Sequence, residues 1–436
     1  MPRVHNCAAL LACSVMLLVL ERPAHAEGDS LRLTRAQVQE RAVGQSAEMV
    51  RRLAVRTQTR LLERESYPFN PEVSVEVTGT PAPWSGTDYA RRIMLEQELD
   101  LRGERRARRS AGRAAAAVAD REYGERAQAI AAEVDGIYSR HLVAQRRASL
   151  LAGLRDRARD LGAKAEHARG RETLSGFDAR LLGSEAVSLE ADWLGARNEA
   201  DVTGAELRVW LELPRHTALA FEDDLGDGVW SCDADSAWVL ARHTRLVVAR
   251  VAAAESLALA RVVVEERHAR ANPTLGASVS RERFELDTGE VGVIHDEGTS
   301  IGLHVRVPLS IFQRNATGIT EARLDVERAR VDRAALDREV RQEAVAACAA
   351  LRGAEDERAL RAVAAESAGR DLQLIEAAYE GGRIPLDEYL TLRERLVRQQ
   401  TAWLESLGRV EAERSRLVRV TGAPRAELAR RFGGAR

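Results

Sequence analysis

The side chains that most often do chemistry in proteins are scattered along this sequence. Beyond residue 26 the histidines form no pair at the spacing of metal ligands on a helix; they stand at positions 141, 167, 216, 243, 268, 295 and 304. No nucleophile and no acid–base pair stands out. The sequence therefore predicts a protein that is not an enzyme, with no catalytic residue, no cofactor and no metal site.

Two further groups of reactive or charged residues have structural interpretations. Cys232 and Cys348 lie in different sequence environments, with neither a disulfide framework nor a zinc spacing. They predict two unpaired thiols. The acidic run 222–224 lacks the pattern of a calcium loop, and it predicts a solvated, irregular segment between two larger units.

Polar residues stand in a regular arrangement in two turns between proline-free segments. Glycine in such a turn takes a positive φ at little cost, and an aspartate after it is suited to cap the next helix. The distance from glycine to aspartate is two residues longer in the first turn than in the second. The residues are Gly170, Ser175 and Asp178 in the first turn, and Gly381, Gly382, Arg383 and Asp387 in the second.

The first residues predict a signal peptide over 1–26. Arg3 precedes an apolar run over 8–20, and residues 24–26 satisfy the small-x-small rule for cleavage. Lipid attachment at Cys13 is the alternative, but the apolar run continues past Cys13, whereas a lipidated cysteine closes such a run. No later segment offers about 18 uninterrupted apolar residues, so a helical membrane anchor is not expected.

The composition indicates long helices and argues against a nucleic-acid partner. The net charge is −2, and removal of the leader, which carries +1, leaves −3, whereas a nucleic-acid binder usually carries a basic excess. Aromatic residues are 4% and charged residues 30% of the chain. Such a composition is typical of helices with narrow apolar seams.

Landmarks recur along the chain at nearly one spacing. The pair Asn-Pro occurs at 70 and at 272, Trp-Leu at 193 and at 403, and a helix-ending proline at 214 and at 424. We interpret this as a duplication. The predicted units are a first repeat over 27–214, a linker over 215–233, a second repeat over 234–424 and a C-terminal tail over 425–436.

Each repeat predicts a helix, a β-hairpin, a long helix and a return helix. The apolar period changes from helical to alternating after each Asn-Pro, and loops over 80–89 and 284–297 separate strands of roughly 8–10 residues. Proline-free helices follow over 104–168 and 314–380, each about 100 Å long at roughly 1.5 Å per residue. The predicted fold class is mainly α, with a β-barrel portion.

The strands have one apolar and one polar face, which favours a membrane barrel. Four strands cannot close such a barrel, since closed barrels have at least eight, but three copies supply twelve. Glu72, Glu76, Glu96, His304 and Arg306 then face a wet lumen, although for His304 by itself the sequence favours a merely solvated histidine. The alternative for the whole sheet is a small soluble packing unit. The predicted lipid-facing residues are Val73, Val75, Val77, Ile301, Leu303 and Val305.

In these features the sequence resembles the outer membrane efflux protein (TolC-like) family, and within it the branch that serves heavy-metal efflux. The resemblance covers nearly the whole mature chain and rests on the duplicated order of elements, on Asn-Pro before each first strand and on the turn at 378–390. It implies a homotrimer with a twelve-stranded barrel in outer-membrane lipid and a helical barrel through the periplasm. It also implies that the two turns form the periplasmic tip.

The resemblance implies the partners and the role of these turns. A periplasmic adaptor protein docks at the tip, and an inner-membrane pump of the resistance-nodulation-division type supplies energy. Arg383 and Asp387 match positions linked to constriction of the tip, but Leu390 stands where some members carry a second aspartate, which puts an acidic selectivity ring in doubt. The predicted function is passive conduction of cargo, such as heavy-metal cations, to the exterior. The alternatives are a conduit for drugs or secreted polypeptides, and an exported periplasmic coiled-coil scaffold with no channel.

Overall fold

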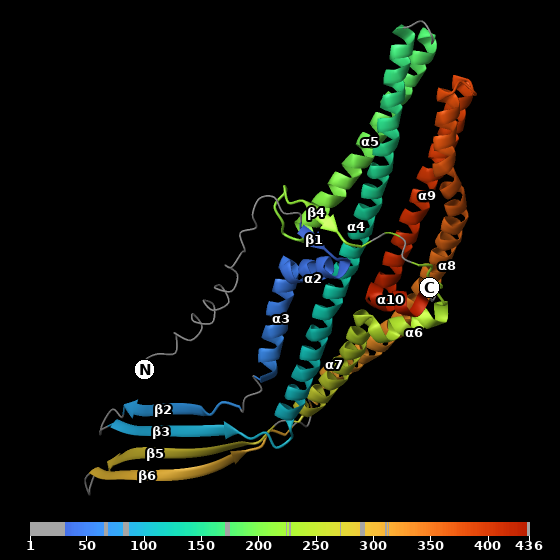
Figure 1. Ribbon diagram of the computed structural model, residues 1–436. Coiled ribbons are helices and arrows are strands. Elements are labelled where there is room, and N and C mark those ends of the chain that lie inside the picture. The colour runs from blue at the N-terminus through green and yellow to red at the C-terminus, as the bar shows by residue number, and fades with distance from the viewer. Residues whose placement is uncertain are drawn as a thin grey trace.

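The chain forms a long helical body with a β-sheet at one end (Figure 1). The computed structural model describes residues 31–64, 69–81, 87–170, 175–223, 225, 228–270, 272–287, 293–309, 312 and 314–433. The predicted signal peptide 1–26, with Cys13, and residues 171–174 of the first turn lie outside the described residues. None of the described helices has the length and apolar character needed to cross a membrane.

The same order of elements occurs twice along the chain. The first set is α2 (Arg35–Gln45), α3 (Ala47–Arg64), β2 (Glu72–Pro81), β3 (Thr87–Glu98), α4 (Glu104–Gly170) and α5 (Gly176–Trp210). The second set is α6 (Ala234–Thr244), α7 (Leu246–His268), β5 (Thr274–Asp287), β6 (Val293–Arg306), α8 (Ala316–Glu380) and α9 (Leu386–Thr421). The mainly helical class is as predicted, but two consecutive helices, not one, precede each hairpin. The boundaries of the two repeats stay predictions.

The two long helices have 67 and 65 residues and contain no proline. Each is therefore about 100 Å long at roughly 1.5 Å per residue. The carboxylate of Asp100 accepts hydrogen bonds from the backbone N–H groups of Glu104 and Arg105, at 2.8 and 3.0 Å, and so satisfies two of the free donors at the start of α4.

The long helices form two antiparallel hairpins, α4 with α5 and α8 with α9, which run side by side (Figure 1). One shared apolar cluster contains Leu151 and Leu154 of α4, Leu189 of α5 and Leu372 of α8. Small side chains in the same seam, such as Ala196, let neighbouring helices approach closely. The two hairpins therefore have a common core along their length.

The hairpins of strands join into one antiparallel sheet with the order β2-β3-β5-β6. The strands are longer than predicted, with 10, 12, 14 and 14 residues, and they extend into the loops expected over 80–89 and 284–297. The alternation of apolar side chains shows which positions share one face of the sheet. Backbone pairing continues past the apolar positions, for example between Arg283 and Glu297, where the side-chain pattern gives no signal.

The linker and the C-terminal tail are more ordered than predicted. Within the linker, β4 (Leu219–Phe221) pairs in parallel with β1 (Leu31–Leu33). Asp223, expected to be solvated, accepts hydrogen bonds from the Tyr138 hydroxyl at 2.6 Å and from the backbone N–H of Arg35 at 2.7 Å. The tail contains α10 (Arg425–Phe432), whose last residue accepts a hydrogen bond from the linker. The order of the linker and of the tail depends on contacts with residues that are far away in the sequence.

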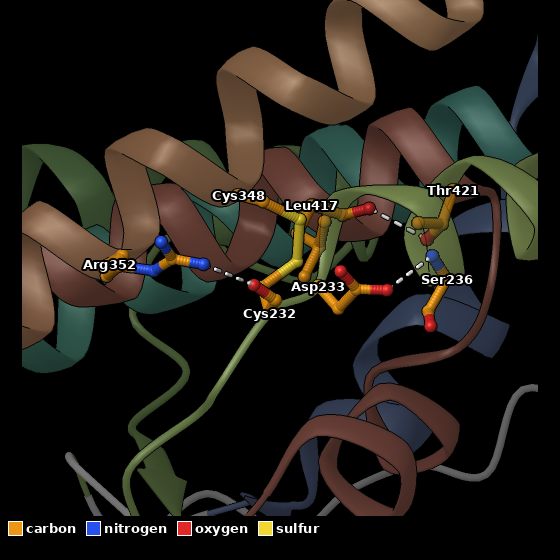
Figure 2. The surroundings of a disulfide bond; sticks show 7 residues. All are labelled: Cys232, Asp233, Ser236, Cys348, Arg352, Leu417 and Thr421. Carbon is orange, nitrogen blue, oxygen red and sulfur yellow. Dashed lines mark hydrogen bonds between the residues drawn. A yellow bond between two sulfur atoms is a disulfide. The ribbon is translucent and has the colours of Figure 1, made fainter.

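The prediction of two unpaired thiols is wrong. Cys232 of the linker and Cys348 of α8 form a disulfide across a sequence separation of 116, with Cα atoms 5.2 Å apart. Arg352, one turn further along α8, donates a hydrogen bond to the backbone oxygen of Cys232 at 3.3 Å (Figure 2). The two cysteines meet because the linker folds back onto α8, which their sequence environments do not reveal.

Replacing Cys348 with serine is expected to lower the free energy of unfolding by about 2–5 kcal/mol, because the disulfide closes a long loop of the unfolded chain. Urea unfolding followed by circular dichroism measures the change. Reduced wild-type protein is the matched control and should unfold with the variant. If the reduced and oxidised wild-type proteins unfold at the same urea concentration, the cross-link does not stabilise the fold.

Candidate functional site

The sheet exposes an apolar face. Cross-strand pairing places Val73, Leu95, Ala277 and Leu303 in one row, and the next row on this face is equally apolar. The six residues predicted to face lipid are between 62% and 82% exposed; they are Val73, Val75, Val77, Ile301, Leu303 and Val305. A contiguous apolar surface of this kind marks a site of contact with a protein or a membrane.

The opposite face of the sheet carries paired charges. Glu96 on β3 contacts His304 Nε2 at 2.7 Å and Arg306 at 3.0 Å, both on β6. His304 is thus not the lone solvated histidine that the sequence favours. It reaches across β5 because Gly276 lies between the two residues, where a Cβ atom would lie only 2.2 Å from the His304 ring. The glycine in β5 is the signal that sequence reasoning missed.

At the other end of the molecule, the first turn connects α4 to α5. Gly170 is the last residue of α4. Ser175 is the N-cap of α5, since its hydroxyl accepts a hydrogen bond from the backbone N–H of Asp178 at 3.1 Å. The prediction that Asp178 caps this helix is therefore wrong. Asp178 lies in the first turn of α5, where its negative charge interacts favourably with the positive end of the helix dipole.

The second turn ends α8 with a glycine in the left-handed region. Gly382 has φ +67°, whereas Gly381 has φ −82° and needs no special conformation. The N–H of Arg383 donates to the Ala378 oxygen at 2.8 Å, and that of Gly382 donates to the Tyr379 oxygen at 2.9 Å. This is a Schellman motif, and it requires a residue that tolerates positive φ at position 382.

The start of α9 corrects the second capping prediction. The N-cap residue is Pro385, which makes no side-chain capping bond, and Asp387 lies in the first turn of α9. Arg383 and Asp387 are both exposed. The prediction that Asp387 caps α9 is therefore wrong, and in a single chain both Arg383 and Asp387 face solvent.

The helix ends next to the two turns share an apolar cluster. Leu161 of α4 and Leu182 of α5 pack with Leu386 and Tyr389 of α9. Tyr389 stacks on the ring of Tyr379 with centroids 4.8 Å apart, and burial raises the pKa of Tyr389 to about 12. The ends of the two helical hairpins are therefore held together within one chain.

An ion pair also joins the two hairpins at this end. Lys164, the only lysine of the sequence, lies on α4, and its Nζ atom is 2.8 Å from both Asp160 of α4 and Glu380 of α8. Hydrogen bonds to these two carboxylates raise the pKa of Lys164. Sequence reasoning missed this contact, although a single lysine among many arginines was a visible signal.

A buried cluster of charges ties four helices together midway along the body. Asp135 of α4 is fully buried, and its carboxylate lies 2.9 Å from Arg35 of α2 and 3.7 Å from Arg425 of α10. Ser415 of α9 donates a hydrogen bond to the same carboxylate. Nothing in the spacing of these residues predicted their contact, since they come from distant parts of the chain.

Nearby, the buried ring of His141 contacts the Thr203 hydroxyl at 3.0 Å. Burial lowers the pKa of His141 to about 4, so the ring is neutral at neutral pH. Within the described part of the chain, no three histidine, cysteine, aspartate or glutamate residues are grouped as metal ligands would be. The candidate functional site is a pair of surfaces, the amphipathic sheet and the helical tip.

Comparison with known proteins identifies this architecture. No protein-family model matches the sequence, and the search of curated proteins found no significant match. Solved structures do match over most of the chain. The CusC structure is 15% identical, with TM-score 0.67, and the match covers 89% of this chain and 92% of that chain; the CusC work concerns conformational changes in folding and transmembrane channel formation.

Two further structures give the same result. The outer membrane protein VceC from Vibrio cholerae is 15% identical, with TM-score 0.67 and coverage of 89% of this chain and 96% of that chain. The CmeC outer membrane channel of Campylobacter jejuni is 14% identical, with TM-score 0.67 and coverage of 91% and 88%. The resemblance read from the sequence is confirmed for the three-dimensional architecture. The protein therefore has the fold of the outer membrane efflux protein (TolC-like) family.

Proposed function

We propose that the chain is one subunit of a homotrimeric outer-membrane channel, the exit duct of a tripartite efflux system. The observation that carries this proposal is the sheet: its apolar face is exposed, and β2 and β6 are edge strands in the single chain. Open edges do not occur in the hydrocarbon region of a bilayer, because their backbone groups have no partner there. Three copies joined edge to edge supply twelve strands and remove every edge.

In the proposed trimer each part of the chain has one task. The apolar face contacts outer-membrane lipid, and the face with Glu96, His304 and Arg306 lines the pore. The helical hairpins extend the duct into the periplasm. The turns dock a periplasmic adaptor, which connects the duct to an inner-membrane pump of the resistance-nodulation-division type; the proposed docking residues are Gly170, Ser175, Asp178, Gly381, Gly382, Arg383 and Asp387.

We propose heavy-metal cations as the first cargo to test, on the branch resemblance of the sequence. Drugs and secreted polypeptides are the alternative cargoes for the same duct. A deletion strain grown on a panel of divalent metals and antibiotics separates them, because sensitivity rises only for compounds that leave through this channel. Complementation with the intact gene is the control.

Cell fractionation tests the channel itself. The mature protein is expected in the outer-membrane fraction, where cross-linking should trap a trimer. The alternative, a periplasmic coiled-coil scaffold, predicts a soluble protein with no trimer. Recovery in the soluble fraction alone would remove the channel proposal.

Replacing Leu303 with arginine is expected to reduce the yield of membrane-embedded trimer strongly. A lipid-facing arginine costs about 2–4 kcal/mol per chain near the bilayer midplane, and three chains carry it. The amount of cross-linked trimer in outer membranes measures the loss. His304→Arg is the matched control, since this neighbour lies on the polar face beside Glu96 and should leave assembly unchanged. Equal losses of trimer in both variants would mean that the face with Leu303 does not contact lipid in preference to the face with His304.

A further inference from the structure

The outward face of the sheet becomes cationic directly beyond its apolar part. Along β3 the outward side chain changes from Ile93 to Arg91, and along β5 it changes from Val279 to Arg281, followed by Arg283. All three arginines are exposed. We call Arg91, Arg281 and Arg283 the arginine group.

Cross-strand pairing concentrates positive charge in this group. Arg91 and Arg281 are directly opposite each other in the β3–β5 register, and like charges in that position destabilise a sheet. Glu297 on β6 lies 2.9 Å from Arg281 and is the one carboxylate described in these two outward rows. Arg91 lies over the ring of Tyr89, 5.2 Å from its centroid. Within these two rows, three arginines therefore face a single described carboxylate.

The position of the group in the sheet points to the bilayer surface. It lies in the half of the sheet nearer the hairpin turns, which point away from the helices (Figure 1): Arg91 is the fifth residue of β3, and Arg281 and Arg283 are the eighth and tenth of the 14 residues of β5. It stands on β3 and β5, the two central strands, so that it stays clear of the edges at which copies would join. In the proposed channel the helices extend into the periplasm, and this end of the sheet reaches the outer leaflet.

We propose that the arginine group binds the phosphate groups of anionic lipids in the outer leaflet. A guanidinium group is planar, stays charged and forms paired hydrogen bonds with phosphate oxygens. The neighbouring apolar rows would contact the acyl chains of the same lipids. The inference rests on the proposed function, because the face meets lipid only when the sheet is inserted in a membrane.

Lipid binding to the purified trimer tests the proposal. Native mass spectrometry measures the affinity of the full-length protein for phosphatidic acid and for phosphatidylcholine in detergent. The variant with Arg91→Gln, Arg281→Gln and Arg283→Gln is expected to bind phosphatidic acid at least about tenfold more weakly than the wild type, because it loses several charge-assisted hydrogen bonds. Binding of phosphatidylcholine should not change.

Two further variants isolate the cause. Arg92→Gln is the matched control, because Arg92 follows Arg91 but faces Glu76, 3.6 Å away, on the polar side of the sheet; it should bind as the wild type does. Replacing the three arginines with lysines keeps the charge but loses the paired hydrogen bonds, and intermediate binding is expected. A loss in Arg92→Gln equal to that of the triple variant would overturn the proposal.

The remaining outcomes are equally decisive. If both trimers bind phosphatidic acid equally, the lipid inference fails while the channel proposal stands. If excess inorganic phosphate displaces the lipid completely, the group is a site for free phosphate and the lipid inference fails. If the wild-type protein cannot be recovered from membranes as a trimer, the channel proposal fails and the inference fails with it.

Discussion

Replacing Gly382 with valine is expected to abolish export while leaving trimers in the outer membrane. Gly382 has φ +67°, in the left-handed region that a β-branched residue adopts only with strain. Valine there would disrupt the Schellman motif between α8 and α9, in which the N–H groups of Gly382 and Arg383 satisfy the last oxygens of α8. The turn proposed to dock the adaptor would then lose its shape.

Export of the cargo identified in the deletion strain, together with the trimer content of outer membranes, measures this effect. Gly382→Asn should restore much of the export, since asparagine tolerates the left-handed conformation. Gly103→Val is the matched control: Gly103 has φ +73° and open space around it, as Gly382 has, but it lies beside the sheet. Normal export by Gly382→Val would remove the docking role, and loss of export by Gly103→Val would assign the effect to general strain.

Replacing Asp135 with alanine is expected to lower the free energy of unfolding by about 3–5 kcal/mol. Removal of one member of a buried charge cluster leaves its partners buried with less compensation, and here Arg35 and Arg425 would keep Glu411, at 3.5 and 2.5 Å, as their carboxylate partner. Here Arg35 and Arg425 would both lose a carboxylate that is fully buried, and Gln39 would lose an acceptor 3.1 Å away. Because these residues belong to α2, α4 and α10, the loss is expected to loosen the middle of the helical body.

Urea unfolding of the purified protein, followed by circular dichroism, measures the difference in stability. Asp156→Ala is the matched control on the same helix, since Asp156 is largely exposed and pairs with Arg155 at 2.6 Å. An exposed pair of this kind contributes at most about 1 kcal/mol. If both substitutions lowered the free energy of unfolding by a similarly small amount, the buried charge cluster would not stabilise the contact between these helices.

Features that repeat with a local period were predictable from the sequence. The absence of proline and the recurring small apolar residues predicted α4 and α8 to within a few residues of their observed ends. Alternation along the strands predicted the exposed apolar face with Val73 and Leu303. The capping residues were harder to predict, because serine, aspartate and proline are all common at the start of a helix. Only the hydrogen bonds of the structure show that Ser175, and not Asp178, caps α5.

Contacts between distant segments were decided by the tertiary structure alone. The disulfide joins residues 116 positions apart, and the charge cluster around Asp135 draws on the first and last helices described. The contact between His304 and Glu96 depends on a gap left by Gly276 in the strand between them. The sequence by itself determined the helices, the strands and their faces, since these follow from periodicity within a segment. Tertiary packing decided which polar side chains contact each other, because a contact between distant segments produces no periodic pattern in the sequence of either one.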